Sequence, residues 1–118
     1  MLSNADRERQ LKIKSGIVKR INKEMLMYSK EAVAQQSRID KMIAEGQDSH
    51  EVKQQEKVLL ETTDILPDCK KRLAVAYGDL DALLTNEYSE SVVSNLPEKE
   101  SLTLSAARTI LEEASSNV

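Results

Sequence analysis

Few side chains in this sequence could act as catalysts or as metal ligands. His50 is the only histidine and Cys69 is the only cysteine. A zinc site needs several ligands, and neither a cysteine nor a second histidine stands at ligand spacing from His50. A catalytic thiol needs a base that activates it, and no histidine stands near Cys69 in the sequence. We therefore predict no catalytic residue, no metal site and no cofactor.

The carboxylates and glycines also argue against an enzyme. Glu112 and Glu113 are adjacent, so on a helix they project from different faces. Asp68 and Arg72 are four residues apart, a spacing at which opposite charges form a structural ion pair on a helix. The three glycines are isolated from one another, which excludes a glycine-rich phosphate-binding loop. The sequence thus predicts a protein that acts by binding.

The composition indicates a few long helices. Only three glycines and two prolines occur in 118 residues, well below the roughly 7% glycine and 5% proline of average proteins. Hydrophobic residues make up 40% of the chain but aromatic residues only 3%, which is typical of helices with aliphatic seams. A chain of this length has room for one domain, so we expect a single domain over residues 1–118.

No segment is apolar enough to cross a membrane. Uninterrupted apolar runs are short, as at residues 25–28, whereas a spanning helix needs roughly 20 such residues. The N-terminus lacks an apolar signal segment, and Asp6 and Glu8 are atypical of a transit peptide. We expect a cytoplasmic protein that does not bind membranes.

Hydrophobic periodicity predicts a first helix over about residues 5–45. Alternating steps of three and four residues from Leu11 meet ten positions, of which eight are apolar. This pattern is typical of a helix packed lengthwise against other helices. Ser3 or Asn4 can cap its start, and Gly46 can close its end. The predicted seam is Leu11, Lys14, Val18, Ile21, Met25, Tyr28, Ala32, Gln35, Ile39 and Met42.

A second helix is predicted over about residues 48–86. Asp48 and Glu51 have the spacing of a capping box. Pro67 removes a helical hydrogen bond, but the heptad phase is unchanged across it, so we predict one continuous helix kinked at Pro67. Leu66, Cys69 and Leu73 should face inward. The full predicted seam is Val52, Gln55, Leu59, Thr62, Leu66, Cys69, Leu73, Ala76, Leu80 and Leu83.

A shorter third helix is predicted over about residues 97–115. Residues 89–95 are rich in Ser and Asn, so we expect a loop there, and Pro97 suits the first turn of a helix. The link at residues 46–48 is short enough to make the first two helices antiparallel. We predict an all-α fold, a left-handed antiparallel three-helix bundle. The seam of the third helix is Leu104, Ala107, Ile110, Leu111 and Ala114.

Charge is distributed unevenly although the net charge is only −3. Residues 1–23 carry seven basic and two acidic side chains, whereas residues 79–118 carry eight acidic and two basic ones. Either the basic end binds an acidic partner, or the two ends pair within the fold. The basic stretch over residues 12–23 contains no aromatic side chain, so we predict no binding of nucleic acid.

Apolar residues also occur outside the seam of the first helix. With Leu11 at heptad position a, these residues fall at positions b and c, which are usually polar. One interpretation is that the third helix covers them. The other is an exposed apolar strip, rimmed by basic residues, that docks on an acidic protein. The apolar residues are Ile13, Leu26, Met27, Val33 and Ala34, and the basic ones are Lys19, Arg20, Lys23 and Lys30.

Two stretches of the chain carry a family resemblance. The first is LKIKSGIVKR at residues 11–20, continuing to residues 28–31. The second runs from residues 53–56 to residues 79–80 and contains Pro67-Asp68-Cys69 followed by basic residues and Leu73. Together they resemble the tubulin-folding cofactor A family over about residues 11–84. Residues 89–105 depart from it, because they are rich in Ser, Thr, Val and Leu where the family is dense in Glu and Lys.

The resemblance implies a chaperone that captures β-tubulin after the cytosolic chaperonin and passes it to later folding cofactors, without nucleotide hydrolysis. It would be cytoplasmic and associated with the cytoskeleton, as a monomer or a homodimer. We predict that Lys19, Arg20 and Lys23 steer the partner and that Leu26, Met27 and Val33 contact it. Lys30 is predicted to belong to the same partner-binding surface. The alternative is a self-associating coiled-coil adaptor or scaffold protein.

Overall fold

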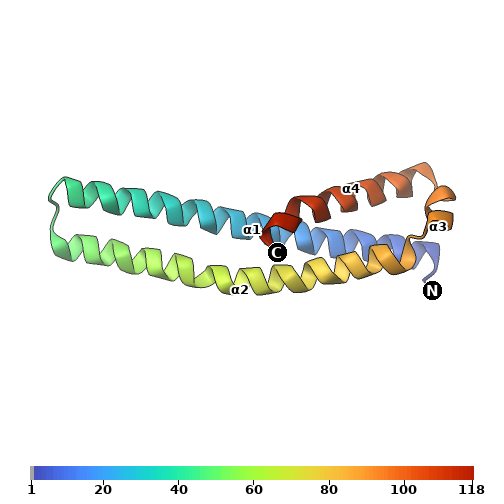
Figure 1. The fold of residues 1–118 in the computed structure, drawn as a ribbon, viewed down its shortest axis with the longest axis horizontal. Helices are drawn as coiled ribbons and strands as arrows, with labels where there is room; N and C mark the ends of the chain where they lie inside the picture. Colours follow the sequence, from blue (N-terminus) through green and yellow to red (C-terminus); the bar gives the residue numbers. More distant parts are fainter. Residues whose placement is uncertain (1) are drawn as a thin grey trace. The chain divides into compact units, whose positions relative to one another are not determined.

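The fold is all-α, as predicted. The computed structural model describes residues 2–118, and these residues form helices and turns without strands (Figure 1). The helices are α1 (Asn4–Ala44), α2 (Ser49–Glu87), α3 (Glu90–Ser94) and α4 (Glu98–Ala114), followed by the 3-10 turn η1 (Ser115–Asn117). The bounds of both long helices agree with the predicted ones to within one residue.

Local side-chain chemistry explains where the long helices begin and end. The Ser3 hydroxyl accepts a hydrogen bond from the Asp6 N–H at 3.2 Å, so Ser3 caps α1. Gly46 closes α1 with a φ of 70°, a conformation that glycine adopts without strain. A carboxylate oxygen of Asp48 accepts from the His50 N–H at 3.1 Å and caps α2. His50 itself is exposed, as predicted.

Pro67 lies inside α2, and the helix continues through it. The predicted continuity is therefore confirmed, because packing of the seam on both sides of Pro67 outweighs the one backbone hydrogen bond that proline removes. The kink at Pro67 and the left-handed sense of the bundle stay predictions. Asp68 and Arg72 are both exposed, and the ion pair between them stays a prediction as well.

The prediction of a loop over residues 89–95 is wrong, because α3 forms there. Ser89 has extended backbone angles, and its hydroxyl accepts from the Val92 N–H at 3.5 Å, which caps a single helical turn. Residues 2–118 therefore contain four helices where we predicted three. Pro97 is the cap of α4 and lies just outside it, so α4 begins one residue later than predicted.

The chain divides into two compact units, and both long helices take part in each. We call residues 2–22 together with Arg72–Val118 the α4 unit, because α4 lies in it, and Lys23–Lys71 the hairpin unit. The hairpin unit consists of the end of α1, the turn and the beginning of α2.

The predicted seams form the core of both units. Every predicted seam position of α1, α2 and α4 is buried or half-buried. In the α4 unit, the side chains of Leu11, Val18, Leu73 and Leu80 are almost completely removed from water. In the hairpin unit, Cys69 and Ile39 are buried, whereas Met25, Tyr28, Leu59 and Leu66 are only half-buried. Leu66 is thus less buried than predicted, because the hairpin unit contains two helices and no third.

None of the helices in residues 2–118 combines the length and the hydrophobicity of a membrane-spanning segment. Within the same residues, no three carboxylate, histidine or cysteine side chains are grouped as metal ligands would be.

Candidate partner-binding face

The off-seam apolar residues of α1 are exposed. Leu26, Met27 and Val33 are 43%, 53% and 68% exposed, and Ile13 is exposed as well. The interpretation that the third helix covers these residues is therefore wrong for all four. The other interpretation, an exposed apolar strip, is confirmed as far as exposure goes. Whether the strip contacts a partner stays a prediction.

The structure brings five of the seven predicted partner-binding residues into the hairpin unit. Lys23 and Lys30 are exposed there and lie three residues before Leu26 and Val33, a spacing that makes them neighbours on the helix surface. Lys19 and Arg20 are exposed too, but they lie in the part of α1 that belongs to the α4 unit.

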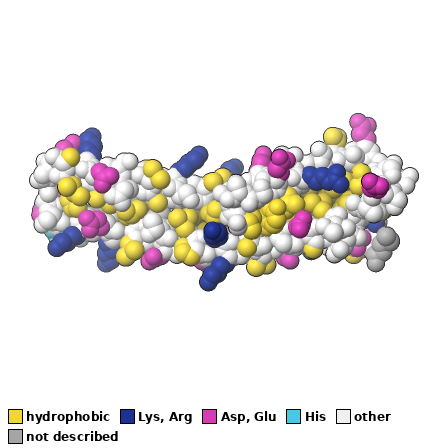
Figure 2. All heavy atoms as spheres, viewed as in Figure 1, with side chains coloured by type: hydrophobic (Ala, Val, Ile, Leu, Met, Phe, Trp, Pro, Cys, Tyr) yellow, Lys and Arg dark blue, Asp and Glu magenta, His cyan; other side chains and the backbone are white. Residues whose placement is uncertain are grey.

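Sequence reasoning missed the apolar residues that α2 contributes to the hairpin surface. Val58, Leu60 and Ile65 are exposed, and Leu60 is 59% accessible. Figure 2 shows hydrophobic side chains among charged ones on the surface of the hairpin. The signal was present in the sequence, because all three residues fall outside the a and d positions of the α2 seam.

Heptad positions define two faces of the hairpin unit. We count α1 from Leu11 and α2 from Val52 as position a. Antiparallel helices that share a seam bring their e positions to one edge of it and their g positions to the other. The edge with the e positions, together with the b positions next to it, is called the b/e face. The edge with the g positions, together with the c positions next to it, is called the c/g face. The b/e face carries Leu26, Val33, Ile43 and Leu60, and the c/g face carries Met27, Ala34, Val58 and Ile65.

The two faces differ in charge. Over the helical residues of the hairpin unit, the b/e face carries two basic and two acidic side chains, and the c/g face carries two basic and five acidic ones. The outer position f is mostly basic and includes Lys23 and Lys30. The b/e face is therefore the one on which an acidic partner meets less repulsion. The acidic residues of the c/g face are Glu24, Glu31, Glu51, Glu61 and Asp68.

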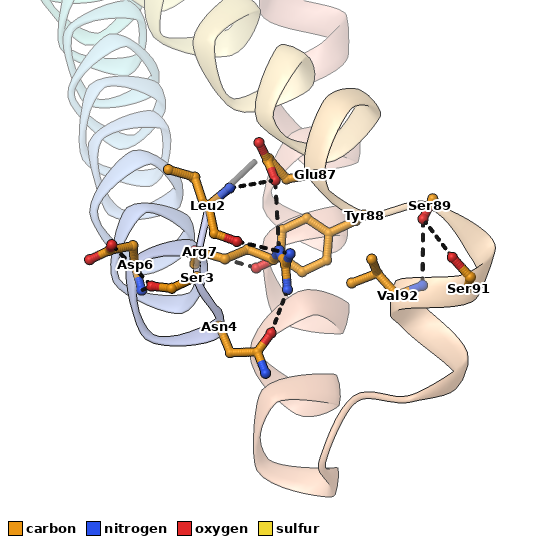
Figure 3. A network of polar contacts seen from close by, with 10 residues as sticks. All are labelled: Leu2, Ser3, Asn4, Asp6, Arg7, Glu87, Tyr88, Ser89, Ser91 and Val92. Atoms are coloured by element: carbon orange, nitrogen blue, oxygen red, sulfur yellow. Dashed lines mark hydrogen bonds and ion pairs between the residues drawn. The ribbon is translucent and has the colours of Figure 1, made fainter.

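A separate polar network lies in the α4 unit and centres on Arg7 (Figure 3). The Arg7 guanidinium donates to the Asn4 side chain at 2.8 Å and to the Leu2 carbonyl at 3.2 Å. Its Nε atom lies 3.9 Å from a carboxylate oxygen of Glu87, and both side chains are largely buried. This ion pair joins the basic and acidic ends of the chain, as one of the two interpretations of the charge asymmetry predicts.

Tyr88 completes the network. Its hydroxyl donates to the Arg7 carbonyl at 3.4 Å, and its ring centroid lies 5.8 Å from the guanidinium, close enough for a cation–π contact. Burial raises the pKa of the Tyr88 hydroxyl, the nearby Arg7 charge opposes this shift, and Glu100, Glu8 and Glu87 add to it. The network fastens the start of α1 to the end of α2, and every cation in it already has a protein partner. We assign it a structural role.

The comparisons with known proteins all point to one family. The sequence model of the family described as tubulin binding cofactor A matches residues 6–111. The chain is 49% identical over 81 residues to the tubulin-specific chaperone A of chicken (Gallus gallus), which covers 69% of this chain and 75% of the relative. It is 41% identical over 92 residues to the tubulin-folding cofactor A of Arabidopsis thaliana, covering 78% and 80% of the two chains.

The similar solved structures belong to proteins with the same description. The crystal structure of tubulin folding cofactor A from Arabidopsis thaliana superposes with a TM-score of 0.80 at 32% identity, over 96% of this chain and 99% of that one. The structure of the human tubulin chaperone cofactor A gives a TM-score of 0.72 at 38% identity, over 92% of this chain and 98% of that one. The similarity thus extends beyond the residues that carried the sequence resemblance and includes α4.

Proposed function

This chain belongs to the tubulin binding cofactor A family, and from that premise we propose that it is a tubulin-folding chaperone. It captures β-tubulin after release from the cytosolic chaperonin and passes it to later folding cofactors. It works in the cytoplasm by protein contact alone, without nucleotide hydrolysis. The observation that carries this proposal beyond the family is the exposed apolar strip of the hairpin unit, with lysines beside it.

The strip suits a holding chaperone for two physical reasons. A folding intermediate presents apolar surface that aggregates unless it is covered, and exposed apolar side chains of this size can cover it. A chaperone that binds only the folded or nearly folded tubulin subunit also stabilises that state of the subunit by mass action. Such a chaperone needs no energy source.

The basic residues have a different role from the apolar ones. Exposed lysines and arginines raise the rate at which an acidic partner associates, and they do so less at high salt. We assign this steering role to Lys19, Arg20, Lys23 and Lys30. Leu26, Met27 and Val33 are the proposed apolar contacts, which hold the complex after the encounter.

Size-exclusion chromatography tests the proposal. The purified protein is mixed with free β-tubulin in one experiment and with intact αβ-tubulin heterodimer in another. We expect co-elution with the free subunit and not with the heterodimer. Equal co-elution with both, or with neither, would contradict a role in capturing the free subunit.

A self-associating adaptor is the second candidate. The apolar residues on both faces of the hairpin unit favour it, because a second copy could cover them. The same chromatography of the protein alone separates the candidates. An adaptor elutes as a stable dimer or larger assembly and has no preference for free β-tubulin.

A further inference from the structure

The α4 unit demonstrates which face of the two long helices accepts a third helix. The η1 turn after α4 reaches Asn22, at position e of α1, where the Asn117 side-chain amide donates to the side-chain Oδ1 atom of Asn22 at 2.8 Å. Ser15, also at position e of α1, is buried, and Tyr77 and Leu84 at position e of α2 are half-buried. On the opposite edge, Gln10, Asp79 and Asn86 at positions g line an open hollow. α4 thus lies along the e positions of its unit, whereas the b positions there, such as Lys12, Lys19 and Asp81, stay exposed.

The hairpin unit repeats the same heptad register without a third helix of its own. Leu26, Val33 and Leu60 occupy positions b and are exposed. Beneath them, the seam residues Met25 and Leu59 are only half-buried, whereas the corresponding a positions of the α4 unit are almost completely buried. The b positions of the hairpin unit are apolar, so a helix that lies over its e and b positions would remove apolar surface from water at the b positions and at the half-buried a positions, which is favourable.

The chemistry of α4 indicates what kind of helix fits. Its inner side carries Leu104, Ala107, Leu111 and Ala114 at spacings of three and four, so small residues alternate with leucine and allow close approach. Its first turn is acidic, with Glu98 and Glu100. Lys23, Lys30 and Lys57 at position f lie between the two faces and offer opposite charges to an acidic helix, and the acidic side chains of the c/g face leave the b/e face as the more favourable side.

We propose that the captured partner contributes an acidic amphipathic helix, and that this helix lies along the b/e face of the hairpin unit as its third helix. This inference rests on the proposed function, because it takes the partner to be β-tubulin. It also narrows the contact residues. Leu26, Val33 and Leu60 belong to the interface, whereas Met27 lies on the c/g face, where the acidic side chains repel an acidic helix.

Paired substitutions on the two faces test the inference. Val33→Gln with Leu60→Gln removes apolar surface from the b/e face, and the matched control Val58→Gln with Ile65→Gln removes it from the c/g face. All four positions are exposed, and Gln is a good helix former, so both variants should fold. The affinity for immobilised β-tubulin is then measured by biolayer interferometry, first with the unaltered protein.

We expect the b/e variant to lose at least about tenfold in affinity, as for residues at the centre of an interface. The c/g variant should stay within about twofold of the unaltered protein. A larger loss from the c/g variant, or equal losses from both, overturns the inference while the chaperone function stands. Failure of the unaltered protein to bind β-tubulin overturns the proposed function itself.

Photo-crosslinking provides a second measurement that does not depend on affinity. A benzophenone amino acid replaces Val33 in one variant and Met27 in the other, and mass spectrometry maps the crosslinked peptide. The inference requires efficient crosslinking from position 33 to a β-tubulin segment with acidic residues and apolar residues at spacings of three and four. Crosslinking to a second copy of this chain would overturn it, as would crosslinking from position 27 alone.

Discussion

At the scale of single residues, Tyr88 connects stability to pH. Its pKa is raised above 10.0 mainly by burial, so the folded state favours the neutral hydroxyl more than the unfolded state does. The corresponding stability is fully present below pH 10.0, the ordinary pKa, and is lost as pH rises through the higher pKa of the folded state.

Tyr88→Phe should therefore flatten the alkaline loss of stability. We expect the free energy of unfolding to fall more steeply above pH 10.0, the ordinary pKa, in the unaltered protein than in the variant. Near neutral pH the variant should lose only about 0.5–1.5 kcal/mol, since one hydrogen bond to the Arg7 carbonyl disappears. Urea unfolding across this pH range measures both quantities. Identical slopes would show that Tyr88 does not couple pH to folding.

The lysines of the hairpin unit should act on the rate of association. Lys23→Glu with Lys30→Glu reverses two exposed charges beside Leu26 and Val33. We expect the association rate constant with β-tubulin to fall roughly tenfold at low salt, and the difference to shrink at high salt. Stopped-flow fluorescence measures the rate.

Lys99→Glu with Arg108→Glu is the control for this experiment. These two side chains are exposed on α4, so the net charge changes equally but at a different place. If the control slows association as much as the Lys23 and Lys30 variant does, the net charge of the protein governs the rate. The assignment of the steering role to the lysines of α1 is then wrong.

At the scale of the helices, the depth of burial differs along the α2 seam. Leu73 is completely buried in the α4 unit, whereas Leu66 is half-buried in the hairpin unit. Leu73→Ala should cost about 2–5 kcal/mol of unfolding free energy, the range for buried leucines. Leu66→Ala should cost about 1–2 kcal/mol, because its side chain keeps part of its contact with water. Denaturant titrations of both variants provide the comparison, and equal losses would contradict it.

The seams and the bounds of the long helices were predictable because burial along a helix repeats every three or four residues. Leu11, Val18, Leu73 and Leu80 could thus be placed in the core from spacing alone. Helix α3 could not, because one turn of helix has no period and depends on the cap at Ser89.

The candidate site was predictable only in part. Leu26 and Val33 stand out because they are apolar at positions that are usually polar, but their exposure depends on where α4 lies. That is a matter of long-range packing, which the local pattern does not encode. Leu60 carried the same signal in α2. Arg7 carried no such signal, because a buried arginine and an exposed one look alike in sequence. Its burial became evident only from the structure, in which Glu87 lies beside it.

At the scale of the whole molecule, the two units should differ in local stability. The α4 unit has a third helix and a seam that is almost entirely buried, whereas the hairpin unit has two helices and a seam in which half-buried positions outnumber the buried ones. Local opening costs less where fewer apolar contacts are lost. We therefore expect backbone amides of residues 25–43 and 51–66 to exchange hydrogen faster than those of residues 11–21 and 73–83.

Partner binding should remove this difference. A helix on the b/e face gives the hairpin unit the third helix that it lacks, so its amides should become as slow to exchange as those of the α4 unit. Hydrogen exchange read by mass spectrometry, with and without a saturating amount of β-tubulin, measures the change in each segment. Protection confined to residues 98–114 of α4 would contradict the proposed face. Slow exchange throughout the free protein would contradict the difference in local stability from which the prediction starts.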